Sequence, residues 1–324
     1  KCYVPPQSDI EKKLVKVYGH VLKIDENKIS VEDNFFYLGG NSILVIKLIN
    51  EINKIFNNEL AVSIIFNNST VRKLSQFILK NNNHDHIYAF NSKGNRTPLF
   101  FVHPGFGGSE TYIELSEHIN KNQRFYAIEF PYYDDNEKLT SINTLANIYI
   151  QHMKKIVPKG PYYLGGWSLG GVIAYEMARI LEMHDEKVVK LYLLDPIFFN
   201  KDFNKDMKQS LIDIAITEED EYLKKEIKNS PNYNKINSNE FKEYIYKNNL
   251  LSESMYKYRP KEYGGNVVLF KAKEDNTLSS LNLSKNNGLG NNVKSINIIR
   301  IDEFHSDMNK GKSVKIIADV INLG

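Results

Sequence analysis

The stretch "YYLGGWSLGGVIAYEMARILEM", Tyr162 to Met183, joins a short apolar run, a glycine-rich turn and a helical pattern. Its middle, Gly166 to Gly170, fits G-x-S-x-G, with a strand predicted before it and a helix after it. A serine in so tight a turn needs glycine two residues away on either side, because larger side chains would collide there. The stretch therefore predicts a domain of strands and helices that presents a nucleophilic serine, Ser168.

Similar apolar runs recur through the second part of the chain and alternate with helical stretches. The predicted strands are residues 99–103, 124–130, 162–167, 187–195, 266–272 and 295–302. This alternation favours a mainly parallel α/β sheet with helices on its faces. Between about 198 and 258 the pattern is helical without a strand, so we expect an insertion above one sheet rather than a second fold.

The first eighty residues have helical spacing instead. Apolar residues recur at steps of three and four in three stretches, which begin at Ile10, Ile43 and Val71. A short turn is expected around residues 61–66, between the second and third stretches. These stretches predict a small all-α domain over residues 1–81, and the fold class that we expect for it is a four-helix bundle.

Composition limits what the chain can be. Its 324 residues, 42% of them hydrophobic, suffice for two cores, and Asn-rich residues 82–96 are expected to link the first domain to one over 97–324. The absence of a long apolar segment argues against a membrane, and the interspersed 42 basic and 39 acidic residues argue against nucleic acid. The single cysteine and the lack of an apolar leader indicate a cytoplasmic fragment of a longer protein.

Several other features of the sequence are interpreted as structural rather than functional. No metal site is predicted. The Asn-rich stretch "KNNGLGNN", residues 285–292, is interpreted as solvated loop. Trp167 is expected to pack the turn around Ser168 rather than to contact a substrate.

A serine hydroxyl needs a base, and the order of residues along the chain restricts the choice. In sheets of this type an acid and then a histidine follow the serine, and of eight histidines only His305 follows the acidic candidates. Asp195 ends a strand directly after the helix that follows Ser168, whereas Asp275 ends the next strand and remains the alternative acid. The more remote candidates are Asp185 and Asp302.

Backbone amides near Ser168 are the candidates for binding a developing oxyanion. The stretch "FFVHPGFGGSE", residues 100–110, bends after the first predicted strand of this domain. Its Phe106 N–H, or that of Gly107, is expected to act together with the Leu169 N–H. The neighbouring His103 is expected to order the loop rather than to titrate in catalysis.

A second serine, Ser42, stands in "DNFFYLGGNSI", Asp33 to Ile43. Gly39 and Gly40 open a loop, and Ser42 begins a predicted helix whose first amides favour a phosphate. The stretch resembles the peptidyl carrier motif D-x-F-F-x-L-G-G-x-S-[LI] at every fixed position, over about residues 6–80. The resemblance implies 4′-phosphopantetheine on Ser42, attached by a phosphopantetheinyl transferase. The other interpretation is that Ser42 only caps its helix.

Residues 97–324 resemble the type I thioesterase domains of nonribosomal peptide synthetases. The resemblance rests on the Ser168 motif, on the spacing of Asp195, on His305 followed by Met308, and on the insertion after Asp195. It implies an α/β-hydrolase fold with a helical lid over about 198–258, and it favours Asp195 as the acid. Upstream condensation and adenylation modules are the partners that it implies.

The two resemblances together imply a carrier and thioesterase from the C-terminal end of a synthetase. A peptidyl thioester held through Ser42 is expected to pass to Ser168 and to leave by hydrolysis or by macrocyclisation. The alternatives are an editing or stand-alone thioesterase or esterase, and an inactive hydrolase-like scaffold module. The motifs do not specify the peptide.

Overall fold

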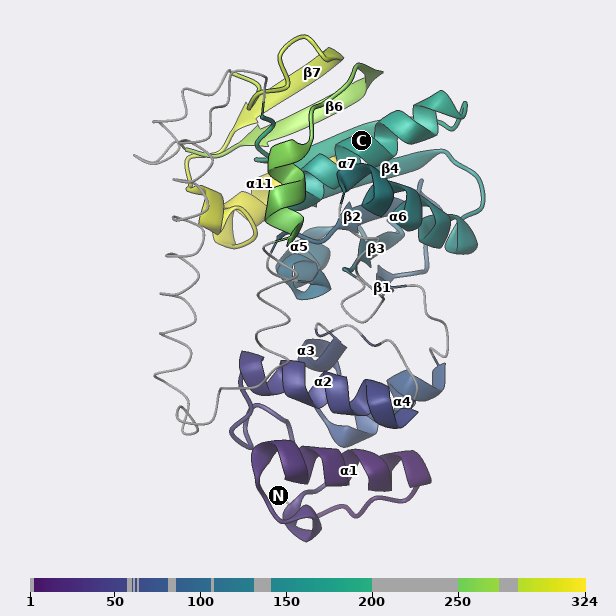
Figure 1. Ribbon diagram of the computed structural model, residues 1–324, viewed down its shortest axis with the longest axis vertical. Coiled ribbons are helices and arrows are strands. Elements are labelled where there is room, and N and C mark those ends of the chain that lie inside the picture. Colours follow the sequence, from purple (N-terminus) through teal and green to yellow (C-terminus); the bar gives the residue numbers. More distant parts are fainter. Residues whose placement is uncertain are drawn as a thin grey trace. The chain divides into compact units, whose positions relative to one another are not determined.

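A computed structural model describes residues 3–56, 60, 62, 64–80, 86–105, 108–130, 141–199, 250–273 and 285–324. These residues form two compact units, one up to His86 and one from Ile87 onward (Figure 1). None of the helices in the described ranges is long and apolar enough to span a bilayer.

The first unit is helical, as predicted. Its helices are α1 (Asp9–Leu22), α2 (Ser42–Phe56), α3 (Ile64–Asn67) and α4 (Val71–Lys80), with a 3-10 turn, η1 (Glu26–Lys28), after α1. The apolar faces of α1, α2 and α4 meet in one core, in which Leu14, Ile49 and Leu74 are fully buried. The spacing of three and four residues therefore identified the faces that pack together.

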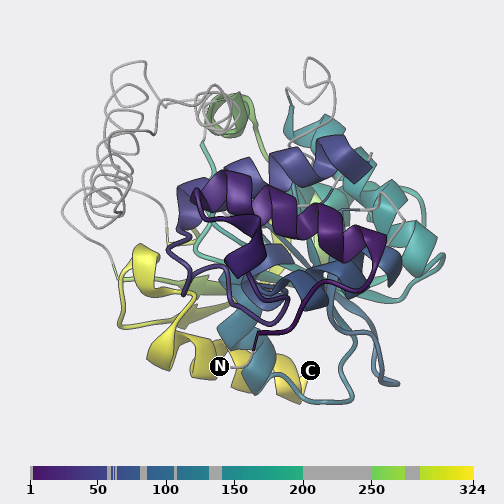
Figure 2. The same ribbon diagram turned by 90° about the horizontal axis from the view of Figure 1, so that it is seen from below.

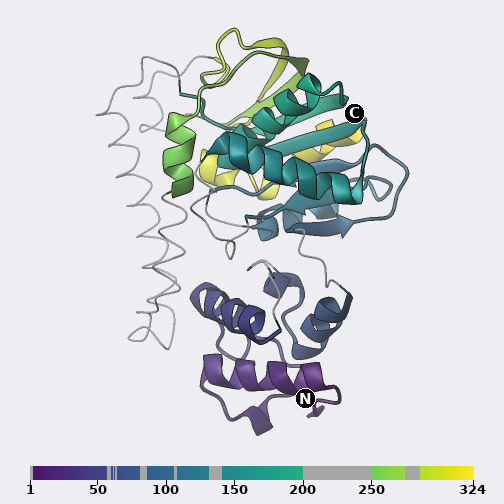
Figure 3. The same cartoon turned by 45° about the vertical axis from the view of Figure 1, so that its right-hand side comes forward.

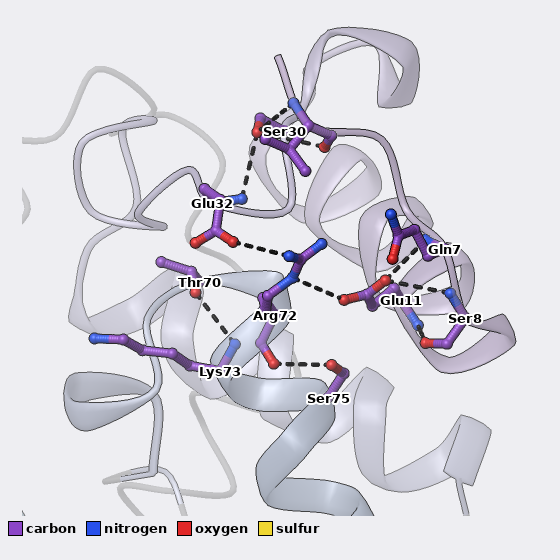
Figure 4. A network of polar contacts seen from close by, with 10 residues as sticks. Gln7, Ser8, Glu11, Ser30, Glu32, Thr70, Arg72, Lys73 and Ser75 are labelled. Carbon is purple, nitrogen blue, oxygen red and sulfur yellow. Dashed lines mark hydrogen bonds and ion pairs between the residues drawn. The ribbon is translucent and has the colours of Figure 1, made fainter. Parts of the chain in front are cut away.

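Side-chain caps and a set of ion pairs connect these helices and their ends. Ser8 and Glu11 form a capping box at the start of α1, and the Thr70 hydroxyl accepts the Lys73 N–H at the start of α4. Figure 4 shows Arg72 of α4 between two carboxylates, with Nε 3.2 Å from Glu11 and Nη1 3.3 Å from Glu32. These ion pairs join α4 to α1 and to the loop that precedes Ser42.

The second unit is built on a seven-stranded sheet in the order β1-β3-β2-β4-β5-β6-β7. Every neighbouring pair is parallel except β1 and β3, so the predicted mainly parallel sheet is confirmed. The strands are β1 (Ile87–Asn91), β2 (Leu99–Val102), β3 (Phe125–Ile128), β4 (Tyr162–Trp167), β5 (Val188–Leu194), β6 (Tyr263–Lys271) and β7 (Val293–Arg300).

Helices cover both faces of this sheet (Figures 2 and 3). On one face lie α6 (Ile142–Ile156) and α7 (Leu169–Met183), which pack on each other, and α7 packs on the central strands. On the other lie α5 (Ile113–His118) and α11 (Gly311–Leu323), whose apolar residues share a core with alternate residues of β2 to β6. The result is a three-layer α/β arrangement. Two 3-10 turns, η2 (Ser109–Tyr112) and η5 (His305–Asp307), lie in its loops.

Strand β1 was not predicted, because it lies inside the segment expected to be a linker. Its residues pair antiparallel with β3, from Ile87 opposite Ile128 to Asn91 opposite Phe125. The short run "IYAFN" follows a stretch rich in Asn and His and lacks a sustained period. The local pattern therefore did not predict a strand there. Its pairing partner decides its conformation, and the sheet therefore begins before residue 97.

The expected insertion leaves the sheet after β5 and returns before β6. Residues 200–249, most of the predicted lid, lie outside the described residues, whereas residues 250–257 are helical. The rings of Phe199 and Tyr256 lie 5.0 Å apart, so the two ends of the insertion meet. Strands β5 and β6 are parallel neighbours in spite of the residues between them. That pairing agrees with an insertion into a single sheet.

Candidate active site and attachment serine

Ser168 occupies the turn between β4 and α7 with an unusual backbone. Its φ of 55° and ψ of −123° are disfavoured for residues with a side chain, and the side chain makes no capping hydrogen bond to α7. The Ser168 N–H donates to the Leu194 carbonyl at the end of β5, 3.0 Å away. The neighbouring strand thus holds the strained turn, and the hydroxyl is not used as a helix cap.

Glycines make this turn possible, as the sequence predicted. A Cβ on Gly166 would lie 2.3 Å from the Gly170 carbonyl carbon, and one on Gly170 would lie 2.3 Å from the Val102 carbonyl oxygen. Both approaches involve backbone atoms, which cannot move aside as a flexible side chain can. The pattern G-x-S-x-G is therefore a steric requirement of the turn.

Asp195 and His305 meet at the same edge of the sheet. Asp195 follows β5 directly, with a φ of 47°, and His305 begins η5 in the loop after β7. His305 Nδ1 lies 2.8 Å from Asp195 Oδ2, although the two residues are 110 positions apart. A carboxylate can only accept, so Nδ1 carries the proton and Nε2 is the nitrogen available to act as a base.

Hydrogen bonds keep the buried Asp195 carboxylate ionised. Burial by itself raises the pKa of this carboxyl, which is only 4% exposed. The hydrogen bond and charge of His305, followed by the hydrogen bonds from Asn287 and the Ala272 N–H, more than offset that effect and hold the pKa below its ordinary value. Asp195 is therefore a fixed anion beside His305.

The other candidate acids are placed differently. Asp302 is exposed, at 93% for its side chain, and pairs with Lys273 at 3.3 Å. Asp185 is an exposed residue in the turn after α7. Asp275 lies outside the described residues. Among the described candidates, only Asp195 contacts the histidine.

Two contacts of the site were not identified from the sequence. Asn287, in the stretch interpreted as solvated loop, donates from Nδ2 to Asp195 Oδ1 at 2.8 Å and is buried. The Trp167 ring lies 5.5 Å from the His305 imidazole, at 36° between planes. Trp167 does pack beside the turn, but its partner is the candidate base. No local pattern signals either contact, because both join segments that are distant in the chain.

The candidate oxyanion site is only half within the described residues. Leu169 is the first residue of α7, so its N–H is among those that no intrahelical carbonyl can accept. Phe106 and Gly107 lie outside the described residues. The helix start nevertheless directs a positive dipole end at the Ser168 turn, which favours a developing negative charge.

Buried polar groups hold the described residues on either side of Phe106 and Gly107. The His103 ring donates from Nδ1 to the Pro104 carbonyl and accepts the Tyr149 hydroxyl at Nε2, both at 2.7 Å. Burial lowers the pKa of His103 to about 4, so the ring is neutral. On the other side, Glu129 accepts the Ser109 N–H at 3.0 Å. His103 thus has the contacts of a residue that orders the loop.

Ser42 is placed differently from Ser168. It is the first residue of α2, and the helix is capped by Asn41, whose Oδ1 accepts the Ile43 and Leu44 N–H groups at 3.1 and 3.0 Å. The alternative that Ser42 only caps its helix is therefore wrong. Ser42 is partly exposed and stands at the positive end of the helix dipole, which suits a phosphodiester. Because Asn41 occupies those two amides, they are not available to a phosphate.

Glycine also shapes the loop before Ser42. A Cβ on Gly40 would lie 2.2 Å from the ring of Phe35, which is fully buried in the core of the first unit. Gly39 has a φ of 98°, in the region that favours glycine. Gly40 therefore lets the loop approach the core closely, and Gly39 allows its turn. The residues fit an attached phosphopantetheine arm.

Two protein families match the two units. The phosphopantetheine attachment site family matches residues 12–78, and the thioesterase domain family matches residues 97–213. Among relatives, Malpibaldin synthetase of Mortierella alpina is 33% identical over 199 residues, which is 60% of this chain and 4% of that protein. Atromentin synthetase of Tapinella panuoides is 35% identical over 195 residues, 57% of this chain and 20% of that protein. The chain thus spans a fifth or less of the length of these relatives.

One solved structure matches the whole of this chain. A holo four-domain nonribosomal peptide synthetase, AB3403, bound to AMP and glycine, matches with a TM-score of 0.61 and 26% identity. The match covers 100% of this chain and 26% of that one. The chain is a phosphopantetheine-binding carrier domain followed by a thioesterase domain of α/β-hydrolase fold, and the proteins that it resembles are synthetases, one of them a nonribosomal peptide synthetase.

Proposed function

We propose that this chain releases a finished acyl or peptidyl product from a synthetase, with Ser42 as the attachment residue and Ser168 as the nucleophile. The observation that supports it most strongly is the 2.8 Å hydrogen bond between His305 and the buried anion Asp195, at the sheet edge where Ser168 occupies its strained turn. These are the three groups that acyl transfer through a serine requires.

In the first half of the reaction the Ser168 Oγ attacks the thioester carbonyl. His305 Nε2 takes the hydroxyl proton as the new C–O bond forms, and Asp195 stabilises the resulting imidazolium. The Leu169 N–H, with that of Phe106 or Gly107, binds the oxyanion. The C–S bond then breaks, and the proton on Nε2 passes to the departing sulfur. An ester on Ser168 and a free thiol result.

In the second half the same residues act on a new nucleophile. His305 Nε2 takes a proton from water, or from a hydroxyl or amine of the bound chain, as that group attacks the ester carbonyl. The C–O bond to Ser168 breaks, and the proton returns to its Oγ. Water gives a free acid and an internal nucleophile gives a macrocycle.

Ser42 is the residue that would hold 4′-phosphopantetheine, through a phosphodiester. The arm supplies a terminal thiol on which the acyl chain arrives as a thioester. Tethering raises the local concentration of substrate to roughly millimolar, so weak affinity for the chain suffices. The implied partners are a phosphopantetheinyl transferase and upstream condensation and adenylation modules.

Mass spectrometry of the loaded protein tests this proposal. The intact mass should rise by one arm after incubation with a phosphopantetheinyl transferase and coenzyme A, and Ser42→Ala should remove the gain. A chain loaded on that arm should then be released by the wild type and retained by Ser168→Ala. Release at the normal rate from Ser168→Ala would overturn the role of that serine.

The alternatives predict different results. An inactive scaffold would not react at Ser168 with a fluorophosphonate, whereas a working nucleophile would be labelled there. An editing or stand-alone enzyme would cleave small soluble thioesters as fast as the loaded chain. Faster release of the chain loaded on Ser42 than of the same acyl group supplied as a small soluble thioester supports release from the carrier.

A further inference from the structure

The Asn-rich loop at residues 285–292 is built against the candidate acid. Asn287 is only 2% exposed, and the following Leu289 is fully buried. The side chain of Asn286 closes the loop through Gly290, accepting its N–H at 3.1 Å and donating to its carbonyl at 2.8 Å. A stretch with the composition of solvated surface is therefore an ordered, partly internal turn.

Asn287 completes the set of donors around the Asp195 carboxylate. Oδ2 accepts from His305 Nδ1, while Oδ1 accepts from Asn287 Nδ2 at 2.8 Å and from the Ala272 N–H at 3.1 Å. Donors on both oxygens oppose rotation about the Cβ–Cγ bond, which would turn Oδ2 away from the imidazole. Because a hydrogen bond to a charged group is stronger than one between neutral groups, the buried amide has a direct effect on the orientation of the anion.

The backbone of the loop is fixed to the segment that leaves Asp195. The Asn287 carbonyl accepts the Phe198 N–H at 2.9 Å, and Asn287 itself has a φ of 53°, which asparagine tolerates better than most residues. A Cβ on Gly288 would lie 1.8 Å from the Phe198 carbonyl oxygen. Neither the loop nor the segment after Asp195 can shift without the other.

We propose that Asn287 is a positioning residue for acyl transfer, which orients Asp195 to receive the His305 Nδ1–H. It acts through the Asp195 carboxylate and does not touch the reacting atoms. The proposal rests on the proposed function, because it assigns a role within that reaction. The orientation of Asp195 by Asn287 can also be tested without any reaction.

The test compares Asn287→Gly with Asn292→Gly in the full chain. Glycine tolerates the positive φ of residue 287, and the substitution removes the side-chain amide. Asn292 lies in the same loop, and its side chain donates to the Leu289 carbonyl at 3.0 Å rather than to Asp195. We expect Asn287→Gly to slow fluorophosphonate labelling of Ser168 by about 10- to 100-fold, from the loss of one hydrogen bond to a charge. Asn292→Gly should label at the wild-type rate.

A spectroscopic reading separates positioning from general damage. The downfield proton resonance of the His305–Asp195 hydrogen bond should shift or broaden in Asn287→Gly and stay unchanged in Asn292→Gly. Unfolding of both variants, followed by Trp167 fluorescence, shows whether the fold is damaged. Asn287→Asp, which keeps the size of the side chain but replaces the donor by a second carboxylate, should disturb the resonance as well. It serves as the second variant if Asn287→Gly does not fold.

Wild-type labelling and an unchanged resonance in the Asn287 variants would overturn the role of Asn287. A wild-type protein that is not labelled at Ser168 would overturn the proposed reaction instead, and the resonance would then still decide whether Asn287 orients Asp195.

Discussion

Ser42, at the start of α2, and Ser168, just before α7, keep their hydroxyls out of helix capping in opposite ways. Ser42 is an ordinary first residue of its helix, and the preceding Asn41 supplies the cap. Ser168 stands in the capping position itself, yet its φ of 55° and ψ of −123° leave its side chain without a capping hydrogen bond. One site is relaxed and locally complete, whereas the other is strained and depends on its neighbours.

The difference follows from what each proposed role requires. A tethering serine needs only an accessible hydroxyl, which a regular helix start provides at no cost in strain. A nucleophile needs a fixed direction relative to a base and to oxyanion donors, and these come from other segments. The turn at Ser168 is therefore held by Leu194 of the next strand and by glycines that permit close backbone approach.

The largest effect is expected from removing the strained hydroxyl. Ser168→Ala should reduce chain release by about 10⁴-fold or more, because the base then has no nucleophile to activate. The free energy of unfolding should change by less than about 0.5 kcal/mol, since no capping bond is lost. Release is measured by mass spectrometry and stability by urea unfolding. Attachment of the arm at Ser42 in the same variant is the control.

The dependence of Ser168 on distant segments predicts the next effect. Asp195→Asn should lower the rate of release by about 10³- to 10⁴-fold, because the amide cannot hold the His305 tautomer or stabilise its charged form. Single-turnover rates of Asp195→Asn and Asp275→Asn decide between the two carboxylates. A greater loss in Asp275→Asn would show that the acid is assigned wrongly. Neither variant should change loading at Ser42.

A buried histidine, His103, should make the free energy of unfolding of the thioesterase unit sensitive to acid. The pKa of His103 is about 4 in the folded protein against 6.5 ordinarily, so between these pH values the unfolded chain binds a proton that the folded chain does not. The free energy of unfolding is unaffected by this group above pH 6.5. It should fall by about 3 kcal/mol as the pH drops to 4.

The fluorescence of Trp167, the one tryptophan of the chain, reports unfolding of this unit at each pH. His103→Gln should be less stable at neutral pH and should lose the part of the pH dependence that His103 causes. An unchanged slope between pH 6.5 and 4 in that variant would contradict the burial of a neutral ring.

The smallest effect concerns the relaxed serine. Asn41→Ala should destabilise α2 by about 1 kcal/mol, because two amides lose the acceptor that caps the helix. Ser42→Ala should change stability much less, since Ser42 is not the cap. Hydrogen exchange of the α2 amides measures both variants. Equal losses in the two would remove the contrast between the serines.

Much of this protein could be predicted from local pattern. The apolar spacing predicted α1, α2 and α4, and the alternation of apolar runs with helical stretches predicted six strands of a mainly parallel sheet. The order of serine, acid and histidine restricted the base to His305. Strand β1 escaped prediction because its pairing with β3, rather than its composition, makes it a strand.

The sequence by itself determined the features whose cause lies within a few residues. Glycines two positions from Ser168 allow its turn, and the motif around Ser42 sets the loop before α2. Only the tertiary structure decided which groups surround Asp195, because His305 and Asn287 lie 110 and 92 positions away from it. Asn287 belongs to a stretch with the composition of an ordinary loop, and it donates to that carboxylate because the fold buries it beside Asp195. Burial and orientation arise from packing between distant segments, which no local pattern encodes.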